Sequence, residues 1–161
     1  MKYLLRHLSS LLLPITILIV VPWLLDPHPK PASPVQLVIG LVIIGLGLYI
    51  MARTILGFFE IGRGTLAPWD PPQNLVIAGM YAYVRNPMIL GVITVVVGEA
   101  LAVSSLPILG FAIFAFALNT VYFMFSEEPG LEKRFGEKYR EYKRNVPRWI
   151  PRLTPWKPQS R

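Results

Sequence analysis

The sequence contains no cysteine and only two histidines among its 161 residues. The absence of cysteine excludes a disulfide framework, a thiolate nucleophile and any zinc or iron-sulfur site that needs cysteine ligands. His7 and His28 lie far in the sequence from other candidate ligands, so no metal site is expected. Charged residues are also scarce, at 16% of the chain against 53% hydrophobic residues. This composition disfavours a water-soluble globular domain.

Four long apolar segments dominate the chain, at residues 8–25, 35–52, 88–103 and 106–125. About 18 apolar residues in a helix are long enough to cross roughly 30 Å of hydrocarbon. Because an isolated segment in lipid satisfies its backbone only as a helix, each segment is predicted to be a transmembrane helix. The first exceeds the length of a signal-peptide core and is interpreted as an uncleaved anchor. The sequence therefore predicts one all-α integral membrane domain, residues 1–161, with four transmembrane helices.

The distribution of cations predicts the topology. The loops after the first and third segments contain one cation, Lys30, while the N-terminus, the middle loop and the tail contain the others. By the positive-inside rule, both termini are expected in the cytoplasm, and a prokaryotic inner membrane fits a compact four-span chain. The basic tail adjoins a membrane and lacks a nucleic-acid recognition motif, so its expected partner is the bilayer and not nucleic acid.

Glu99 is the one acidic residue inside the third apolar segment. An ionisable side chain in a span is a functional candidate. Glu99 lies about one turn from the outer end, however, where its carboxylate can reach water or hydrogen-bond Ser104. The structural interpretation is therefore favoured for this residue.

The predicted cytoplasmic segments, residues 63–87 and 126–151, contain the candidate chemistry. The first is longer than a helical hairpin requires, and its residues 64–72 are predicted to form a rigid, Pro-rich lip at the membrane interface. It ends with Arg85 ahead of Pro87, and proline is well placed in the first turn of a helix. Arg85 alone is compatible with a simple membrane anchor.

Two adjacent carboxylates, Glu127 and Glu128, follow the fourth segment, where the helix dipole would favour a cation. Either they begin a new helix with Ser126 as its N-cap, or they bind a ligand. From Leu131 to Val146, apolar and aromatic residues recur at spacings of three and four, which predicts a cytoplasmic amphipathic helix. Such a helix can lie on anionic lipid or fold over a bound cofactor.

Four motifs along the chain occur in an order that is typical of a known family. They are Gly79-x-Tyr81-x-x-x-Arg85-Asn86-Pro87, Glu127-Glu128-x-x-Leu131, Phe135-Gly136-x-x-Tyr139-x-x-Tyr142 and Val146-Pro147-Arg148. Over roughly residues 64–151 the chain resembles the isoprenylcysteine carboxyl methyltransferase family and its phospholipid methyltransferase relatives. The resemblance implies a membrane enzyme that transfers a methyl group from S-adenosylmethionine to a hydrophobic or prenylated, lipid-like acceptor at the cytoplasmic face, with S-adenosylhomocysteine as product.

The resemblance also implies site residues. The implied cofactor contacts are Gln73, Asn74, Leu75, Val76, Tyr81, Asn86, Pro87, Met88, Ile89 and Glu127. The candidate catalytic residues are Arg85, Glu128 and Arg148. Methyl transfer is an in-line displacement at a sulfonium, so it requires alignment and exclusion of water more than an acid or a base.

Three residues depart from the family pattern. Asn86 replaces the usual His, Ile89 replaces the usual Tyr, and Phe123 stands where carboxyl methyltransferases have a substrate-binding Arg. A carboxylate acceptor would then need Arg85 or Arg148 as its cation. Three alternatives stay open: a phospholipid amine N-methyltransferase, an NADPH-dependent membrane reductase, and a non-catalytic scaffold that holds anionic lipid.

Overall fold

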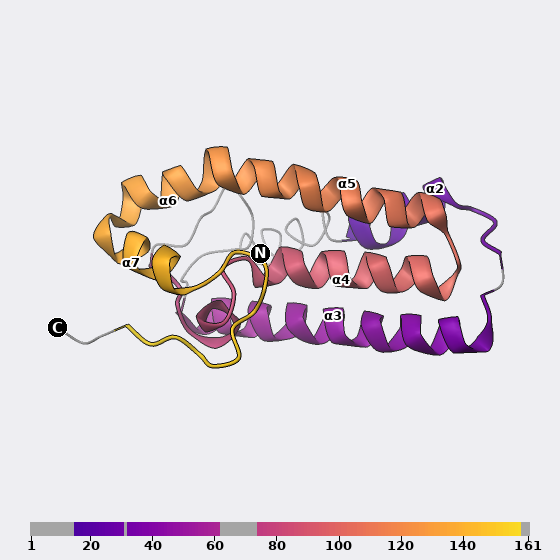
Figure 1. Cartoon of the computed structure of the whole chain (residues 1–161), viewed down its shortest axis with the longest axis horizontal. Helices are drawn as coiled ribbons and strands as arrows, with labels where there is room; N and C mark the ends of the chain where they lie inside the picture. Colours follow the sequence, from indigo (N-terminus) through magenta and orange to yellow (C-terminus); the bar gives the residue numbers. More distant parts are fainter. Residues whose placement is uncertain (1–14, 31, 62–73, 159–161) are drawn as a thin grey trace, which may run out of the picture.

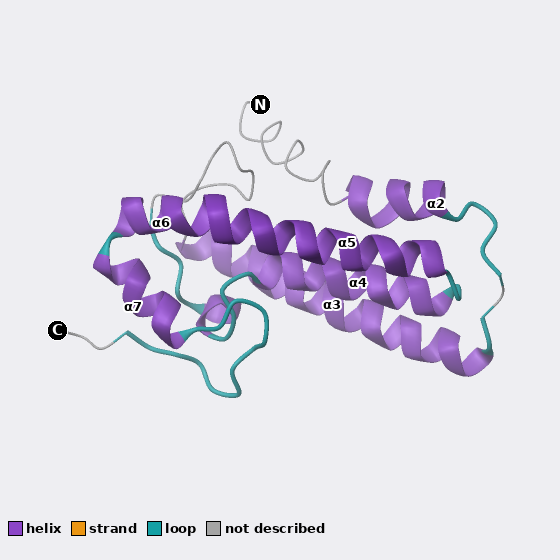
Figure 2. Cartoon of the chain, turned by 45° about the horizontal axis from the view of Figure 1, so that its top comes forward, coloured by secondary structure: helices purple, strands orange, loops and turns teal. Residues whose placement is uncertain are grey.

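The computed structural model of the chain describes residues 15–30, 32–61 and 74–158, with the side chains of 58–61 excepted. Every regular element in these ranges is a helix, and none of the described residues is in a strand. Helices α3 (Pro34–Ile61), α4 (Pro87–Ala102) and α5 (Leu106–Tyr122) lie side by side along the long axis (Figure 1). A short helix, α2 (Val21–Leu25), follows a π-helical turn, η1 (Thr16–Val20), and packs near one end of α5 (Figure 2). The predicted all-α fold is confirmed for the described residues.

Helices α3 and α4 pack backbone against backbone. A Cβ atom built on Gly47 would lie 2.8 Å from the carbonyl oxygen of Gly91, and one built on Gly98 would lie 2.8 Å from that of Gly40. The glycines of each helix are seven residues apart, which places them on one face. Small residues allow this close approach, which is typical of helix pairs in membranes.

Helices α4 and α5 form a hairpin. Its turn is so tight that Ser104 has a φ of 52°, and the Ser105 hydroxyl then caps α5 by accepting from the Ile108 amide at 3.4 Å. The Glu99 carboxylate does not bond to Ser104, whose hydroxyl lies 3.5 Å from Gln36 Oε1. Glu99 Oε2 is buried, and no group in the described part of the chain hydrogen-bonds to it.

Large apolar side chains cover the outer faces of α3 and α5. The exposed ones include Val38, Leu41, Val42, Leu46, Ile113, Phe114, Leu118 and Val121. So large an apolar surface is unfavourable in water and indicates membrane association. Among the residues that the structure describes, two helices are long and apolar enough to cross a membrane, Pro34–Gly57 and Leu106–Phe135. The described helices Thr16–Leu25 and Pro87–Ala102 are shorter, and residues 8–14 of the first predicted span lie outside the described residues. The structure therefore supports two candidate spans and does not confirm the predicted four.

Of the two alternatives for Glu127 and Glu128, the one in which Ser126 caps a new helix is wrong. Helix α5 continues through a π-helical turn, η3 (Phe123–Glu127), into α6 (Glu128–Phe135), and Ser126 lies inside the π turn instead of capping a new helix. Pro129 explains the wider turn, because it has no amide hydrogen and its ring would clash with the carbonyl of Phe125 in a regular α-helix. The Glu128 amide accordingly donates to Phe123 O.

The predicted amphipathic helix is two helices, α6 and α7 (Glu137–Asn145), that meet at Gly136. Gly136 has φ 58° and ψ −132°, a conformation that only glycine adopts readily. The predicted apolar face is nevertheless confirmed, because Tyr139, Tyr142 and Val146 form one buried cluster. Side chains from α6 and from two distant segments pack around this cluster, namely Leu75, Ile77, Leu131, Phe135 and Trp156.

The segments that connect the helices lie at the two opposite ends of the helices. The α2–α3 and α4–α5 connections lie at one end, and segment 74–86, α6, α7 and the C-terminal residues lie at the other (Figure 1). This is the grouping that the cation distribution predicts. The predicted lip, residues 64–72, lies outside the described residues.

Candidate functional site

The C-terminal strap, which we define as residues 146–158, runs along residues 82–85 just before α4. The three backbone hydrogen bonds that join them are Arg85 N–H to Pro147 O, Arg152 N–H to Tyr83 O and Trp156 N–H to Ala82 O, each 2.9 Å long. Two segments more than sixty residues apart in sequence are thereby held together. Helix α7 is tied to the same region, because the Tyr142 hydroxyl donates to Tyr81 O at 2.8 Å.

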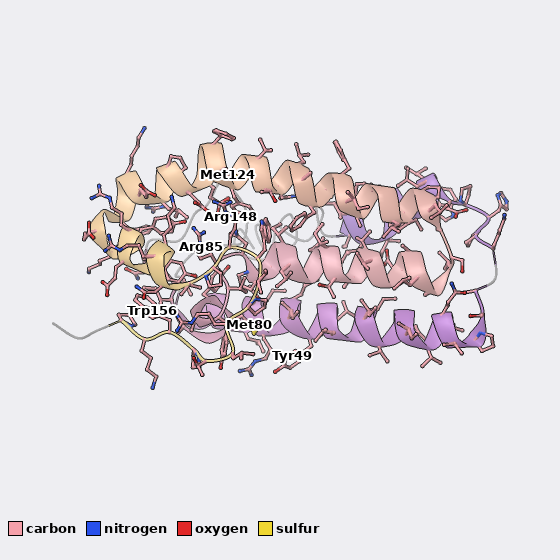
Figure 3. All side chains as sticks on the ribbon, in the orientation of Figure 1. Tyr49, Met80, Arg85, Met124, Arg148 and Trp156 are labelled. Carbon is pink, nitrogen blue, oxygen red and sulfur yellow. The ribbon has the colours of Figure 1, made fainter. Side chains whose placement is uncertain are left out.

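The three candidate catalytic residues meet in one buried ion cluster. Glu128 is 2% exposed, and Arg148 binds it through Nε to Oε1 at 2.6 Å and through Nη2 to Oε2 at 3.0 Å. Arg85 Nη1 lies 2.9 Å from Glu128 Oε1 without directing an N–H at it, so this contact is an ion pair alone. Lys143 Nζ lies 3.3 Å from Glu128 Oε2 and 2.7 Å from Glu132 Oε1. Arg85 and Arg148 lie near each other below the α5–α6 helix in Figure 3.

This cluster joins four parts of the chain: the end of segment 74–86, α6, α7 and the strap. The hydrogen bond to Glu128 raises the pKa of Arg148 above its ordinary value. The hydrogen bond to Glu132 does the same for the pKa of Lys143. Hydrogen-bonded charges of opposite sign compensate each other's burial, whereas an unpaired one would be costly.

The Glu127 carboxylate lies next to this cluster but is not part of it. Glu127 is half-buried in η3, and no hydrogen bond or ion pair connects its carboxylate to another described residue. It lies close to Tyr81, in the 3₁₀ turn η2 (Gly79–Ala82). Burial, and after it the negative charge of Glu127, raise the pKa of the Tyr81 hydroxyl.

Asn86 presents a second polar group without a partner. It immediately precedes α4, and its amide nitrogen Nδ2 is buried with no hydrogen-bond acceptor among the described residues. A buried donor left unpaired costs about 1–3 kcal/mol, so such groups are rare unless a ligand completes them. Within the described ranges, Asn86 and Glu127 thus offer one donor and one acceptor without partners, at the same end of the helices.

The other predicted cofactor contacts differ in what their side chains can reach. Asn74 is exposed, while Val76 and Pro87 are buried and Ile89 is half-buried. The Leu75 side chain packs on the Tyr139 cluster, and that of Met88 packs on the core between the helices. Leu75 and Met88 therefore offer a ligand mainly their backbone groups. Gln73 lies outside the described residues.

Reasoning from the sequence did not single out Trp149. Its ring lies 5.8 Å from that of Phe123 and 4.9 Å from that of Phe116, measured between centroids. Its indole nitrogen Nε1 is buried and has no hydrogen-bond partner within the described ranges. In the sequence, this tryptophan lies between two proline-arginine pairs in a tail that is not expected to be helical. The two prolines indicate that its backbone is held rigidly, but the sequence does not show which residues its ring contacts.

A sequence model of the phospholipid methyltransferase family matches residues 35–138, which is more than half of the chain. The match includes α3, α4, α5 and α6, and therefore Arg85, Asn86, Glu127 and Glu128. Searches of curated proteins and of solved structures found no significant match. Because the match extends over more than half of its length, the chain belongs to the phospholipid methyltransferase family.

Proposed function

We propose that this protein is an S-adenosylmethionine-dependent methyltransferase that acts on a hydrophobic, lipid-like acceptor at the cytoplasmic face of a membrane. The observation that carries the proposal is a pair of groups with no hydrogen-bond partner among the described residues, Asn86 Nδ2 and the Glu127 carboxylate, within the range that matches the family. In this proposal the chain crosses the bilayer four times and has both termini in the cytoplasm. The family match favours methyl transfer over the reductase and scaffold alternatives.

The unpaired groups suit the polar parts of the proposed cofactor. Glu127 accepts hydrogen bonds from ribose hydroxyls or from the ammonium group, and Asn86 donates to a carboxylate or ring nitrogen. Tyr81 supplies a ring face beside them, which attracts a cationic group by roughly 0.5–2 kcal/mol. Backbone groups of residues 73–76 and 87–89 complete the proposed contacts. When bound, S-adenosylmethionine supplies a methyl group on a sulfonium.

Arg85, Glu128 and Arg148 are assigned a positioning role in this proposal. The two guanidinium groups already bind Glu128, so neither is free to act as an acid or a base. Together they fix the strap and segment 82–86 around Asn86, which orients the cofactor contacts and excludes water. An in-line displacement requires these two contributions more than proton transfer.

The acceptor is either a prenylcysteine-like carboxylate or a phospholipid amine. Phe123 is 7% exposed and lies against Trp149, so no cation occupies this position on the helix. A carboxylate acceptor must then be held by other donors, and an amine acceptor must lose a proton before it attacks. Incubation with isotope-labelled methyl donor and either substrate class, followed by identification of the labelled product, distinguishes the two.

Calorimetry with S-adenosylhomocysteine in maltoside micelles tests the cofactor site. The wild type is expected to bind, and Glu127→Gln is expected to bind about tenfold more weakly, since a charged hydrogen bond contributes about 1.5–3 kcal/mol. Glu137→Gln is the matched control, because Glu137 is exposed on α7 and pairs only with Arg140 and Arg144 there. Absence of binding to the wild type would overturn the proposed function.

A further inference from the structure

Trp149 lies in a part of the strap that makes no backbone hydrogen bond to segment 82–85. The backbone bonds of that pairing are made by Pro147 and Arg152, so the residues between them are free to turn outward. Arg148 turns to Glu128, and Trp149 reaches the side of α5 and η3, where it contacts Phe116 and Phe123. The strap thus inserts an indole ring beside a helix that is otherwise covered with exposed apolar side chains.

This contact bridges the apolar surface and the polar end of the molecule. Phe116 and Phe123 are seven residues apart, or about two helical turns, and share one face of the helix. Phe116 is 38% exposed, whereas Phe123 is 7% exposed. Glu127 follows Phe123 by one π turn. A lipid chain that lies along α5 would therefore meet the Trp149 ring shortly before its head reached Glu127.

The indole nitrogen is the unexplained part of this arrangement. Trp149 Nε1 is buried, and among the residues that the structure describes none accepts its hydrogen. A buried indole N–H normally has an acceptor, and leaving it unpaired costs about as much as a lost hydrogen bond, roughly 1–3 kcal/mol. An indole nitrogen only donates, so the missing partner must be an oxygen or another lone-pair atom.

We propose that Trp149 positions the methyl acceptor by donating its indole N–H to an oxygen of the acceptor's polar head, a carboxylate or phosphate oxygen. The Trp149 ring, with Phe116 and Phe123, contacts the adjoining apolar chain. This inference rests on the proposed function and adds a residue that determines specificity. A neutral donor from the strap then performs the task for which carboxyl methyltransferases use an arginine at the position of Phe123.

Nuclear magnetic resonance of isotope-labelled tryptophan tests the inference directly. The chain has four tryptophans, and the Trp149 indole signal is assigned by its absence in Trp149→Phe. In maltoside micelles, N-acetyl-S-farnesylcysteine supplies a carboxylate, dioleoylphosphatidylethanolamine supplies a phosphate, and squalene supplies neither. A downfield shift of the Trp149 signal with an oxygen-bearing probe but not with squalene is expected, and the effective probe identifies the oxygen. No shift with either probe, or an equal shift with squalene, would overturn the inference.

The affinity of the effective probe provides the second measurement. Trp149→Phe keeps an aromatic ring but removes the donor, so the probe's Kd is expected to rise about five- to tenfold while that of S-adenosylhomocysteine stays unchanged. Trp23→Phe is the matched control, because Trp23 is exposed on α2 at the opposite end. An unchanged probe Kd in Trp149→Phe would reject the inference alone. A Trp149 shift in a protein that does not bind S-adenosylhomocysteine would reject the proposed function instead.

Discussion

Arg148 and Glu128 form a two-point contact between the strap and α6, with nitrogen-oxygen distances of 2.6 and 3.0 Å. Arg85 and Lys143 approach the same carboxylate, so one buried anion faces three cations from three other segments. This cluster thus connects α6 and α7 to the strap and to segment 82–86 through buried charges.

Glu128→Gln is expected to lower the thermal unfolding midpoint strongly. The substitution leaves Arg85 buried without its counter-charge, and breaking a buried ion pair in this way costs about 3–5 kcal/mol. Thermal unfolding in maltoside micelles, followed by circular dichroism, measures the effect. Glu137→Gln removes a carboxylate from two exposed ion pairs and should leave the midpoint unchanged. Equal midpoints for the two variants would show that the cluster contributes no stability.

Gly47→Ala is expected to destabilise the pairing of α3 with α4. The added Cβ would lie 2.8 Å from both the Gly91 carbonyl oxygen and the Val95 amide nitrogen, so the backbones must separate. Overpacking of this kind typically costs about 1–3 kcal/mol. Gly45→Ala is the matched control, because a Cβ at Gly45 has no atom within 4 Å. The unfolding midpoints of the two variants in the same detergent give the comparison, and a loss in Gly45→Ala alone would contradict the described packing.

Alkaline pH is expected to destabilise the protein through its buried tyrosines. Burial, and after it the charge of Glu128, raise the pKa of Tyr139 from 10.0 to about 12, and burial also raises that of Tyr142. The folded state therefore keeps protons that the unfolded state releases above pH 10. The stabilisation is complete below pH 10 and is lost as the pH rises through about 12.

The unfolding midpoint measured in steps across this pH range, together with tyrosinate absorbance, tests that expectation. Tyr139→Phe should reduce the fall of the midpoint above pH 10, because it removes one of the buried hydroxyls that titrate there. An alkaline fall of the same size in Tyr139→Phe would show that Tyr139 titrates normally.

Features that depend on local composition were predictable from the sequence. Both ends of α4 lie within one residue of the predicted segment 88–103, and α5 begins at the predicted residue 106. The length and hydropathy of an apolar segment are sufficient to predict such a helix. The end of α3 was less predictable, since the helix runs to Ile61 and not to residue 52. Helices often extend beyond an apolar segment where their polar residues reach water.

Features that depend on contacts between distant residues were not predictable. The sequence left open whether a new helix begins at Ser126, whereas in the structure a π turn accommodates Pro129 within a continuous helix. The candidate residues Arg85, Glu128 and Arg148 lie together in the structure, yet the sequence gives no sign that they bind one another. Trp149 was missed because its significance lies in its contact with Phe123, 26 residues earlier in the chain.

Gly136→Ala is expected to disturb the junction of α6 with α7 and, through it, the ion cluster. At φ 58° and ψ −132° an alanine is strained by about 1–3 kcal/mol, so the turn should relax and move Lys143 away from Glu128. Gly130→Ala, within α6, is the matched control, because its Cβ would meet no atom within 4 Å and alanine favours the helix. The expected result is a lower unfolding midpoint for Gly136→Ala and an equal or higher one for Gly130→Ala. If both variants matched the wild type, the left-handed turn at Gly136 would not be the joint that brings α7 back onto the ion cluster.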